Sequence, residues 1–328
     1  MGRSGLFAIN LLRNDGFYCR VCCFAMEWSS TALRVLRAIA ELGSFTAAAG
    51  ALGYTQSAVS RQMAVLEHAA GTPLFERRSG GATLTAAGAT LLRHASAALD
   101  DLDRAERALH GIEPGGGTVR VGVFTSIGAA VLPETLTLMR RRRPDVDVVT
   151  REGPTAALTR SLRAGTLDLA VISARPPYPA PDDQDPPLEL DVLLEGELLV
   201  AVPADSRLGR DGTVGLDDLQ TATWVSGPHT TGEHGIGVWP ALPQRPIIGH
   251  QTRDWLSKLS LVAAGYGVTT LPPYLLALVP DTVRVVRVAE GAPVTRRVLL
   301  ARLPGLITDA VDDLAACLRD AIDGLPLP

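Results

Sequence analysis

The chain has 328 residues, of which 46% are hydrophobic and 20% charged, so it can bury a sizeable core and form two or three domains. Its formal charge of -4 excludes attraction of nucleic acid through a globally positive field, so any such binding depends on a local patch. No apolar run reaches the roughly 20 residues of a membrane span, and no signal-peptide pattern is present, so we expect no membrane partner. The four cysteines form no evenly spaced framework of the kind that secreted domains use, so we expect a cytoplasmic protein.

The first 25 residues show no periodicity that continues into the helical pattern after Met26. We predict a disordered extension over residues 1–25, with Met26 as the real or an alternative start. Cys19 and Cys22 form a Cys-x-x-Cys pair that could be half of a zinc site, but no second pair and no nearby histidine completes four ligands. We therefore expect neither a metal nor a cofactor.

Three helices are predicted between residues 29 and 71, each bounded by a capping side chain and a glycine. The first repeats leucine and isoleucine at helical spacing. The second is rich in alanine, whose small side chain permits a close helix crossing. The third begins after Thr55, ends at Gly71 and has an apolar stripe of Val59, Met63 and Leu66.

The opposite face of the third predicted helix is polar. Two helices joined by a short glycine turn are typical of a helix-turn-helix, whose second helix lies in the major groove of DNA. Arginine binds guanine in bidentate fashion, glutamine binds adenine, and serine bonds a base edge or a phosphate. We predict DNA contacts from this face; the alternative is an ordinary solvated helix surface. The candidate residues are Gln56, Ser57, Ser60 and Arg61.

A short hairpin is predicted next, from Leu74 through a turn at residues 79–81 to Leu84. Arg77 and Arg78 lie near its tip. Beside a helix-turn-helix such a wing reaches phosphates or the minor groove, although a solvated hairpin tip is the alternative. Residues 26–88 are thus predicted to form a winged helix-turn-helix domain.

A long helix is predicted after Thr85, and we assign its residues 89–112 as a linker and dimerisation helix. It has a recurring apolar seam opposite a face of mixed charge. We expect a partner subunit to cover that seam; the alternative is packing against the chain's own C-terminal part. The seam consists of Leu91, Leu92, Ala95, Leu99, Leu102 and Leu109.

After the glycine-rich linker "EPGGG", strands alternate with helices, which predicts an α/β domain over residues 117–328. Residues 118–172 are predicted to form two consecutive βαβ units, with one helix over residues 127–143. A second set of strands and helices predicts a second α/β lobe and a final helix over residues 306–323.

Open α/β sheets bind ligands at the carboxyl ends of their strands, where Thr125 and Ser126 follow the first strand. Their hydroxyls and the helix N–H groups are suited to hold a carboxylate, and Ser226 is placed to face them from the second lobe. The alternative is that these hydroxyls only cap helices. No catalytic or nucleotide-binding motif is found, so we expect a protein that is not an enzyme.

The segment "LRVLRAIAELGSFTAAAGALGYTQSAVSRQMAVLEHAAGTPLFERRSGGATLTAAGATLL" resembles the N-terminal domain of LysR-type transcriptional regulators. The later "VRVGVF", "RRRPDVDV", "GTLDLAVI" and "VAAGYGVTTLP" are similar to their effector-binding domain. The resemblance implies a winged helix-turn-helix, a linker helix that pairs two subunits, and a two-lobed effector domain of the periplasmic-binding-protein type.

By position, the resemblance also implies roles for the candidate residues. Gln56, Ser57, Ser60 and Arg61 match the recognition helix, Arg77 and Arg78 the wing, and Thr125, Ser126 and Ser226 the effector cleft. Two departures stand out: Ser57 occupies a position where proline is usual, and Ala64 one where a basic residue is common.

The leading hypothesis is a sequence-specific regulator that binds double-stranded DNA as a homodimer or homotetramer and responds to a small-molecule effector. One alternative is a regulator that binds DNA constitutively without a ligand response. Another is an α/β solute-binding or enzymatic protein with an incidental helical N-terminus.

Overall fold

The structure is a computed structural model that describes residues 28–78, 81–109, 117–227, 237–289, 291, 293–305 and 308–327. Within these ranges the side chains of residues 77, 78, 104 and 107–109 are not described. The predictions for residues 1–25, including the Met26 start and the Cys19–Cys22 pair, lie outside the described residues.

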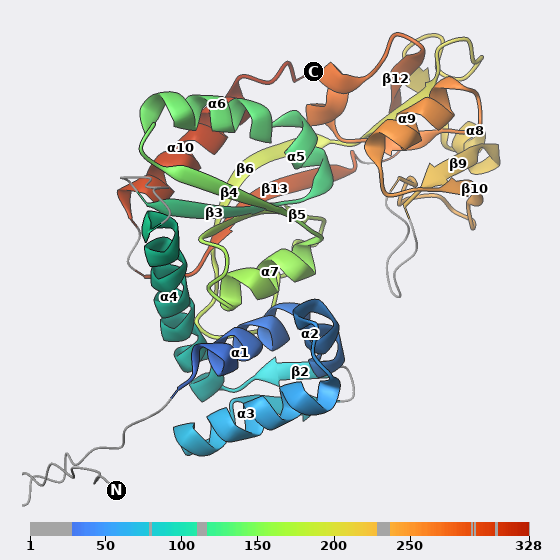
Figure 1. Cartoon of the computed structure of the whole chain (residues 1–328). Coiled ribbons are helices and arrows are strands. Elements are labelled where there is room, and N and C mark those ends of the chain that lie inside the picture. Colours follow the sequence, from blue (N-terminus) through green and yellow to red (C-terminus); the bar gives the residue numbers. More distant parts are fainter. Residues whose placement is uncertain are drawn as a thin grey trace, which may run out of the picture.

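The N-terminal domain begins with three capped helices (Figure 1). The hydroxyls of Ser29, Ser44 and Thr55 each accept a backbone N–H of the helix that comes next, at 3.1–3.4 Å. Each helix ends at a glycine with φ of 66–70°, a left-handed conformation that glycine adopts without strain. The predicted helices are confirmed as α1 (Ser30–Leu42), α2 (Phe45–Leu52) and α3 (Gln56–Ala70).

A two-stranded antiparallel hairpin comes after α3. Strand β1 (Phe75–Arg78) pairs with β2 (Gly81–Leu84), with Arg78 opposite Gly81. The Ala82 N–H donates to the Gly43 carbonyl at 2.9 Å, which ties the hairpin to the turn between α1 and α2. Because Leu74 and Phe75 are buried in one core with α1 and α3, helix-turn-helix and wing form a single packed unit, as predicted.

The long helix α4 (Ala86–Leu109) begins after Thr85, whose hydroxyl accepts the Gly88 N–H at 3.0 Å. Most of its apolar seam is covered by this chain. Leu92 and Leu99 are fully buried in the same core as α1, along which α4 packs. The expectation that a partner covers the seam is therefore wrong for this part of the helix, whereas Leu102 is 54% exposed.

The larger lobe of the C-terminal domain, lobe I, spans residues 117–197 and 295–327 and contains a sheet in the order β4-β3-β5-β13-β6. Strand β3 is parallel to β4 and β5, as the two predicted βαβ units require, and β13 is antiparallel to β5 and β6. Helices α6 and α10 lie on one face and α7 on the other (Figure 1). The elements are β3 (Thr118–Val123), α5 (Thr125–Ala130), α6 (Leu132–Arg142), β4 (Asp147–Glu152), α7 (Thr155–Arg163), β5 (Leu169–Ala174), β6 (Glu189–Glu197), β13 (Thr295–Arg302) and α10 (Asp309–Asp323).

The prediction of one helix over residues 127–143 is wrong, because the structure has two helices there. Helix α5 ends before Val131 (φ -115°, ψ -43°), and α6 begins at Leu132 with Pro133 in its first turn. Proline has no N–H to donate to the preceding turn, so Pro133 fits the start of a new helix and not the middle of a continuous one.

The smaller lobe, lobe II, spans residues 198–289 and contains a sheet in the order β11-β7-β12-β8 and a parallel pair, β9 and β10. The chain crosses between the lobes from β6 to β7 and from β12 to β13, so the predicted two-lobed arrangement is confirmed. The elements are β7 (Leu199–Pro203), β8 (Thr213–Val214), α8 (Leu216–Thr221), β9 (Thr223–Ser226), β10 (Ile247–Gln251), α9 (Trp255–Ala263), β11 (Thr269–Leu271), the 3₁₀ helix η1 (Pro273–Leu278) and β12 (Val283–Val288).

Ion pairs join the N-terminal domain and α4 to lobe I. The Arg151 guanidinium lies 3.1 Å from the Glu41 carboxylate at the end of α1. The Asp100 carboxylate of α4 lies between Arg37 of α1 (3.2 Å) and Arg120 of β3 (3.1 Å). Helix α1 therefore rests directly beneath α7 (Figure 1).

Candidate DNA interface and effector site

The exposed face of α3 has the arrangement predicted for the recognition helix. Val59, Met63 and Leu66 are buried, which fixes the rotation of the helix on its domain. Gln56, Ser57 and Arg61 are exposed and Ser60 is half-buried on the other side.

Hydrogen bonds already orient part of this face. The Gln56 side-chain amide donates to the Ser60 hydroxyl at 3.0 Å, and the hydroxyls of Thr55 and Ser57 lie 3.1 Å apart. Among the described residues, no side chain forms an ion pair or hydrogen bond with Arg61. The guanidinium of Arg61 is therefore free to contact DNA, and the DNA-binding roles of these residues stay predictions.

The wing lies beside this helix because the Leu74 and Phe75 N–H groups donate to the Glu67 carboxylate of α3, at 2.8 and 3.2 Å. Arg77 and Arg78 are the last two residues of β1, opposite Ala82 and Gly81. Gly81 has φ +134°, and a Cβ there would lie 2.5 Å from the Gly43 carbonyl oxygen. Only glycine permits this approach of wing and turn. Only the backbone of the two arginines is described, so their contacts with DNA stay predictions.

The two predicted effector hydroxyls of lobe I are both engaged within the chain. Thr125 donates to the Glu152 carboxylate at 2.7 Å. The Ser126 hydroxyl lies 3.2 Å from that of Tyr274 in η1, and burial raises the pKa of Tyr274 to about 12. Ser126 thus ties lobe I to the segment after β11 in lobe II.

Ser226 ends β9 at the predicted place in lobe II. Its side chain is fully buried, and its hydroxyl has no hydrogen-bond partner among the described residues. A Cβ on Gly237 would lie 3.2 Å from the Ser226 Cα, so that glycine packs over this strand end. No described contact joins Ser226 to Thr125 or Ser126, and the effector roles of all three stay predictions.

Lys258 of α9 is a charged residue that the sequence did not assign to the site. It is 1% exposed, and its ammonium lies 4.5 Å from the centre of the Trp255 ring. Burial lowers the pKa of Lys258 to about 8. The sequence contained a signal for this residue, because Lys258 is the only lysine of the chain and lies one turn into the predicted helix.

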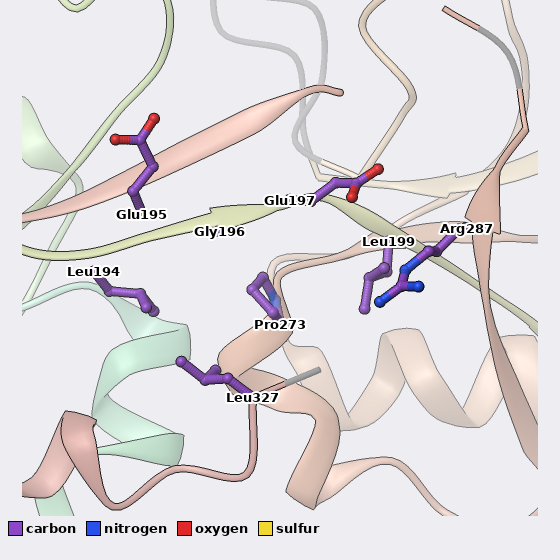
Figure 2. Close-up of a pocket in the computed structure, with 8 residues that line it drawn as sticks. All are labelled: Leu194, Glu195, Gly196, Glu197, Leu199, Pro273, Arg287 and Leu327. Atoms are coloured by element: carbon purple, nitrogen blue, oxygen red, sulfur yellow. The ribbon is translucent and has the colours of Figure 1, made fainter. Parts of the chain in front are cut away.

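A pocket of about 260 Å³ lies where β6 continues into β7 (Figure 2). The figure shows apolar side chains, including Leu194, Pro273 and Leu327, on one side of the strand and Glu195 on the other. Glu195 is paired with Arg297 at 2.8 Å. None of the three predicted effector hydroxyls lines this pocket.

A winged helix-turn-helix joined to a two-lobed α/β domain defines a DNA-binding regulator with a ligand-binding module. Residues 30–89 match the family model described as bacterial regulatory helix-turn-helix protein, lysR family, and residues 113–323 match the LysR substrate binding domain. The chain belongs to the LysR family of transcriptional regulators. The predictions of double-stranded DNA, a small-molecule effector and self-association as partners are confirmed at the level of the family.

Two relatives are similar over most of the chain. One is a probable hydrogen peroxide-inducible genes activator of Streptomyces viridosporus, 31% identical over 90% of this chain and 95% of the relative. The other is a small neutral protease regulatory protein of Streptomyces coelicolor, 34% identical over 87% of this chain and 85% of the relative. The first is named as an activator of genes and the second as a regulatory protein.

Solved structures share the fold. A full-length OxyR variant from Pseudomonas aeruginosa matches with a TM-score of 0.55 at 20% identity, over 92% of this chain and 96% of that one. Full-length BenM matches with a TM-score of 0.50 at 24% identity, over 92% and 99%. Among the described residues, no helix is long and apolar enough to cross a membrane, and no three metal-ligating side chains gather.

Proposed function

We propose that this regulator reads its operator with the exposed residues of α3, supported by the wing. The observation that carries the proposal is the polarity of α3, whose apolar stripe is buried and whose polar side chains face outward. A helix held in this way presents donors and acceptors to base edges in the major groove. The proposed contacts are Gln56, Ser57, Ser60 and Arg61 on α3, and Arg77 and Arg78 on the wing.

Replacing Arg61 with alanine is expected to weaken operator binding by about 1–3 kcal/mol, or roughly 5- to 150-fold, if the guanidinium reads a base. The operator is first mapped by sequencing the genomic fragments that the purified protein retains, beginning with the promoter beside its own gene. Affinities are then compared on that operator and on unrelated DNA at several salt concentrations.

The matched control is Arg140→Ala, an exposed arginine on α6, in lobe I and away from α3 (Figure 1). We expect its operator affinity to be unchanged. If Arg61→Ala remains folded and binds the operator as tightly as the wild type, Arg61 does not read the sequence. An equal loss on operator and unrelated DNA instead identifies a phosphate contact.

We also propose that the C-terminal domain binds a small molecule between its lobes and that Thr125, Ser126 and Ser226 lie at that site. The support is the position of all three at carboxyl ends of strands, where open α/β sheets bind ligands. The bond between Ser126 and Tyr274 links α5 to η1, so a ligand that competes for either hydroxyl alters the contact between the lobes.

One relative is named for a response to hydrogen peroxide. The cysteine within the described residues, Cys317, is not suited to sense peroxide. Peroxide oxidises exposed thiolates of low pKa. Cys317 is 1% exposed, and burial raises the pKa of its thiol. We also infer that this chain, which belongs to a family of regulators, has no enzymatic role and acts in the cytoplasm.

A further inference from the structure

Lys258 has an unusual environment for a charged side chain. Helix α9 packs on β7, β9, β11 and β12 of lobe II. Those four strands contain no aspartate or glutamate, and the charged residues on them are Arg284 and Arg287 of β12. In the part of the chain that the structure describes, no carboxylate is within ion-pair distance of the Lys258 ammonium.

The nearest carboxylate in sequence, that of Asp254, is already used. It caps α9 by accepting the Ser257 N–H at 2.6 Å. The ring of Trp255 attracts the ammonium but cannot neutralise its charge. Lys258 also lies near the N-terminus of α9, the positive end of the helix dipole. Burial and the dipole therefore both disfavour the charged form of a lysine in this place.

Backbone contacts place the start of α9 beside Ser226. The Thr252 N–H donates to the Ser226 carbonyl at 2.9 Å, and the Thr252 hydroxyl accepts the Asp254 N–H at 3.2 Å. Side chains of a helix point toward its N-terminus, and the position of the ammonium over Trp255, three residues earlier, agrees. The lysine side chain thus points back along α9, toward the end of the helix at which Thr252 bonds the Ser226 carbonyl.

The apolar side chains beside Lys258 on α9 belong to a core that spans both lobes. Leu259 and Val262 belong to a core that also contains Ile127 and Val131 of lobe I, and Trp255 packs against it. Lys258 lies between Trp255 and Leu259 along α9. The start of α9 therefore lies close to the carboxyl end of β9, and Lys258 follows it on the side of the helix that packs in the core shared by both lobes.

We propose that Lys258 and Ser226 form the anion-binding part of the effector site, where they receive a carboxylate, sulfate or similar oxyanionic group of the effector. The ammonium supplies the charge and the Ser226 hydroxyl, which has no partner among the described residues, supplies a donor. This inference rests on the proposed function and deepens it. It also moves the expected anion from α5, where the Glu152 carboxylate already holds Thr125, to lobe II.

Because Lys258 is the only lysine, labelling with ¹⁵N-lysine yields a single side-chain signal in the full-length protein. The pKa of Lys258 is followed by NMR in the presence of sulfate, succinate or benzoate, at constant ionic strength. Succinamide and benzamide are the neutral controls. We expect at least one anion to raise this pKa saturably toward 10.5 and the amides to leave it unchanged. Whether sulfate or the two carboxylates raise the pKa shows whether the site prefers an inorganic oxyanion or a carboxylate.

Two variants decide whether the charge of Lys258 is responsible for anion binding. Lys258→Met keeps the length and apolar body of the side chain, and it is expected to bind the active anion at least tenfold more weakly. Lys258→Arg keeps the charge and is expected to bind within tenfold of the wild type. If no anion in the set raises the pKa of Lys258, or if Lys258→Met binds the anion as tightly as the wild type, the inference is overturned.

Glu233 is the only carboxylate in residues 228–236, which lie outside the described residues. Glu233→Gln tests whether the chain itself neutralises Lys258. If that substitution lowers the pKa of Lys258 in the ligand-free protein, an internal partner serves the lysine and the inference is wrong; an unchanged pKa supports it. Operator binding is measured in a separate experiment. If the protein binds no operator, the proposed function is contradicted, whereas the anion titration tests the anion site alone.

Discussion

Replacing Gly88 with alanine is expected to lower the free energy of unfolding of the DNA-binding domain by about 3 kcal/mol. A Cβ at this position would lie 2.1 Å from the Leu74 carbonyl oxygen and 3.0 Å from the Leu74 carbonyl carbon. Both are backbone atoms, so no rotamer change relieves the clash. The Leu74 oxygen also accepts the Thr85 N–H at 3.0 Å, which holds the start of α4 against the wing.

The measurement is hydrogen exchange followed peptide by peptide in the full-length protein. Protection in α1 to α4 is expected to fall by roughly 100-fold, while the strands of lobe II keep theirs. The control is Gly50→Ala in α2, because a Cβ at Gly50 meets no atom within 4 Å. That change is expected to stabilise the domain by about 0.5–1 kcal/mol, since alanine favours helix more than glycine does. Equal effects of the two substitutions would exclude the Leu74 clash as the cause.

Replacing Lys258 with methionine is expected to stabilise the ligand-free protein by about 3 kcal/mol at pH 7. Burial lowers the pKa of Lys258 from 10.5 to about 8, and the difference corresponds to a free-energy cost of that order for keeping the folded lysine charged. The cost is fully present below pH 8. Methionine has a similar length and no charge to bury.

The sign of the pH dependence is set by proton binding. Between about pH 8 and 10.5 the unfolded lysine keeps its proton while the folded one releases it, so the free energy of unfolding of the wild type rises with pH in this window. The advantage of Lys258→Met should therefore shrink to near zero by pH 10.5. Urea unfolding followed by tryptophan fluorescence reports on this region, because Trp224, Trp239 and Trp255 lie in lobe II. A difference that is flat from about pH 7 to 10.5 would show that the charge of Lys258 has no part in it.

Much of the N-terminal domain could be predicted from the sequence because its signals are local. A capping hydroxyl and a closing glycine act within about four residues of each helix end, so Ser29, Ser44 and Thr55 mark the three helix starts. The buried stripe of α3 then determines which side chains face outward. The break at Val131 was missed, although Pro133 was a local signal for it.

The partners of surfaces and hydroxyls were not predictable in this way. An apolar seam such as that of α4 indicates that something covers it, but only the tertiary structure shows that α1 does so over Leu92 and Leu99. The hydroxyls of Thr125 and Ser126 are at the predicted strand end, yet their bonds to Glu152 and Tyr274 join residues 27 and 148 positions apart. Such long-range pairs have no periodicity in the sequence.

The sequence by itself determined the family, the order of the domains and the outward face of α3, because caps, glycine turns and hydrophobic periodicity act over a few residues. Only the tertiary structure decided that Lys258 is buried on strands without a carboxylate and that its helix starts beside Ser226. The physical reason is that the cost of a charge depends on the solvent and charges around it in space, which the fold assembles from distant parts of the chain.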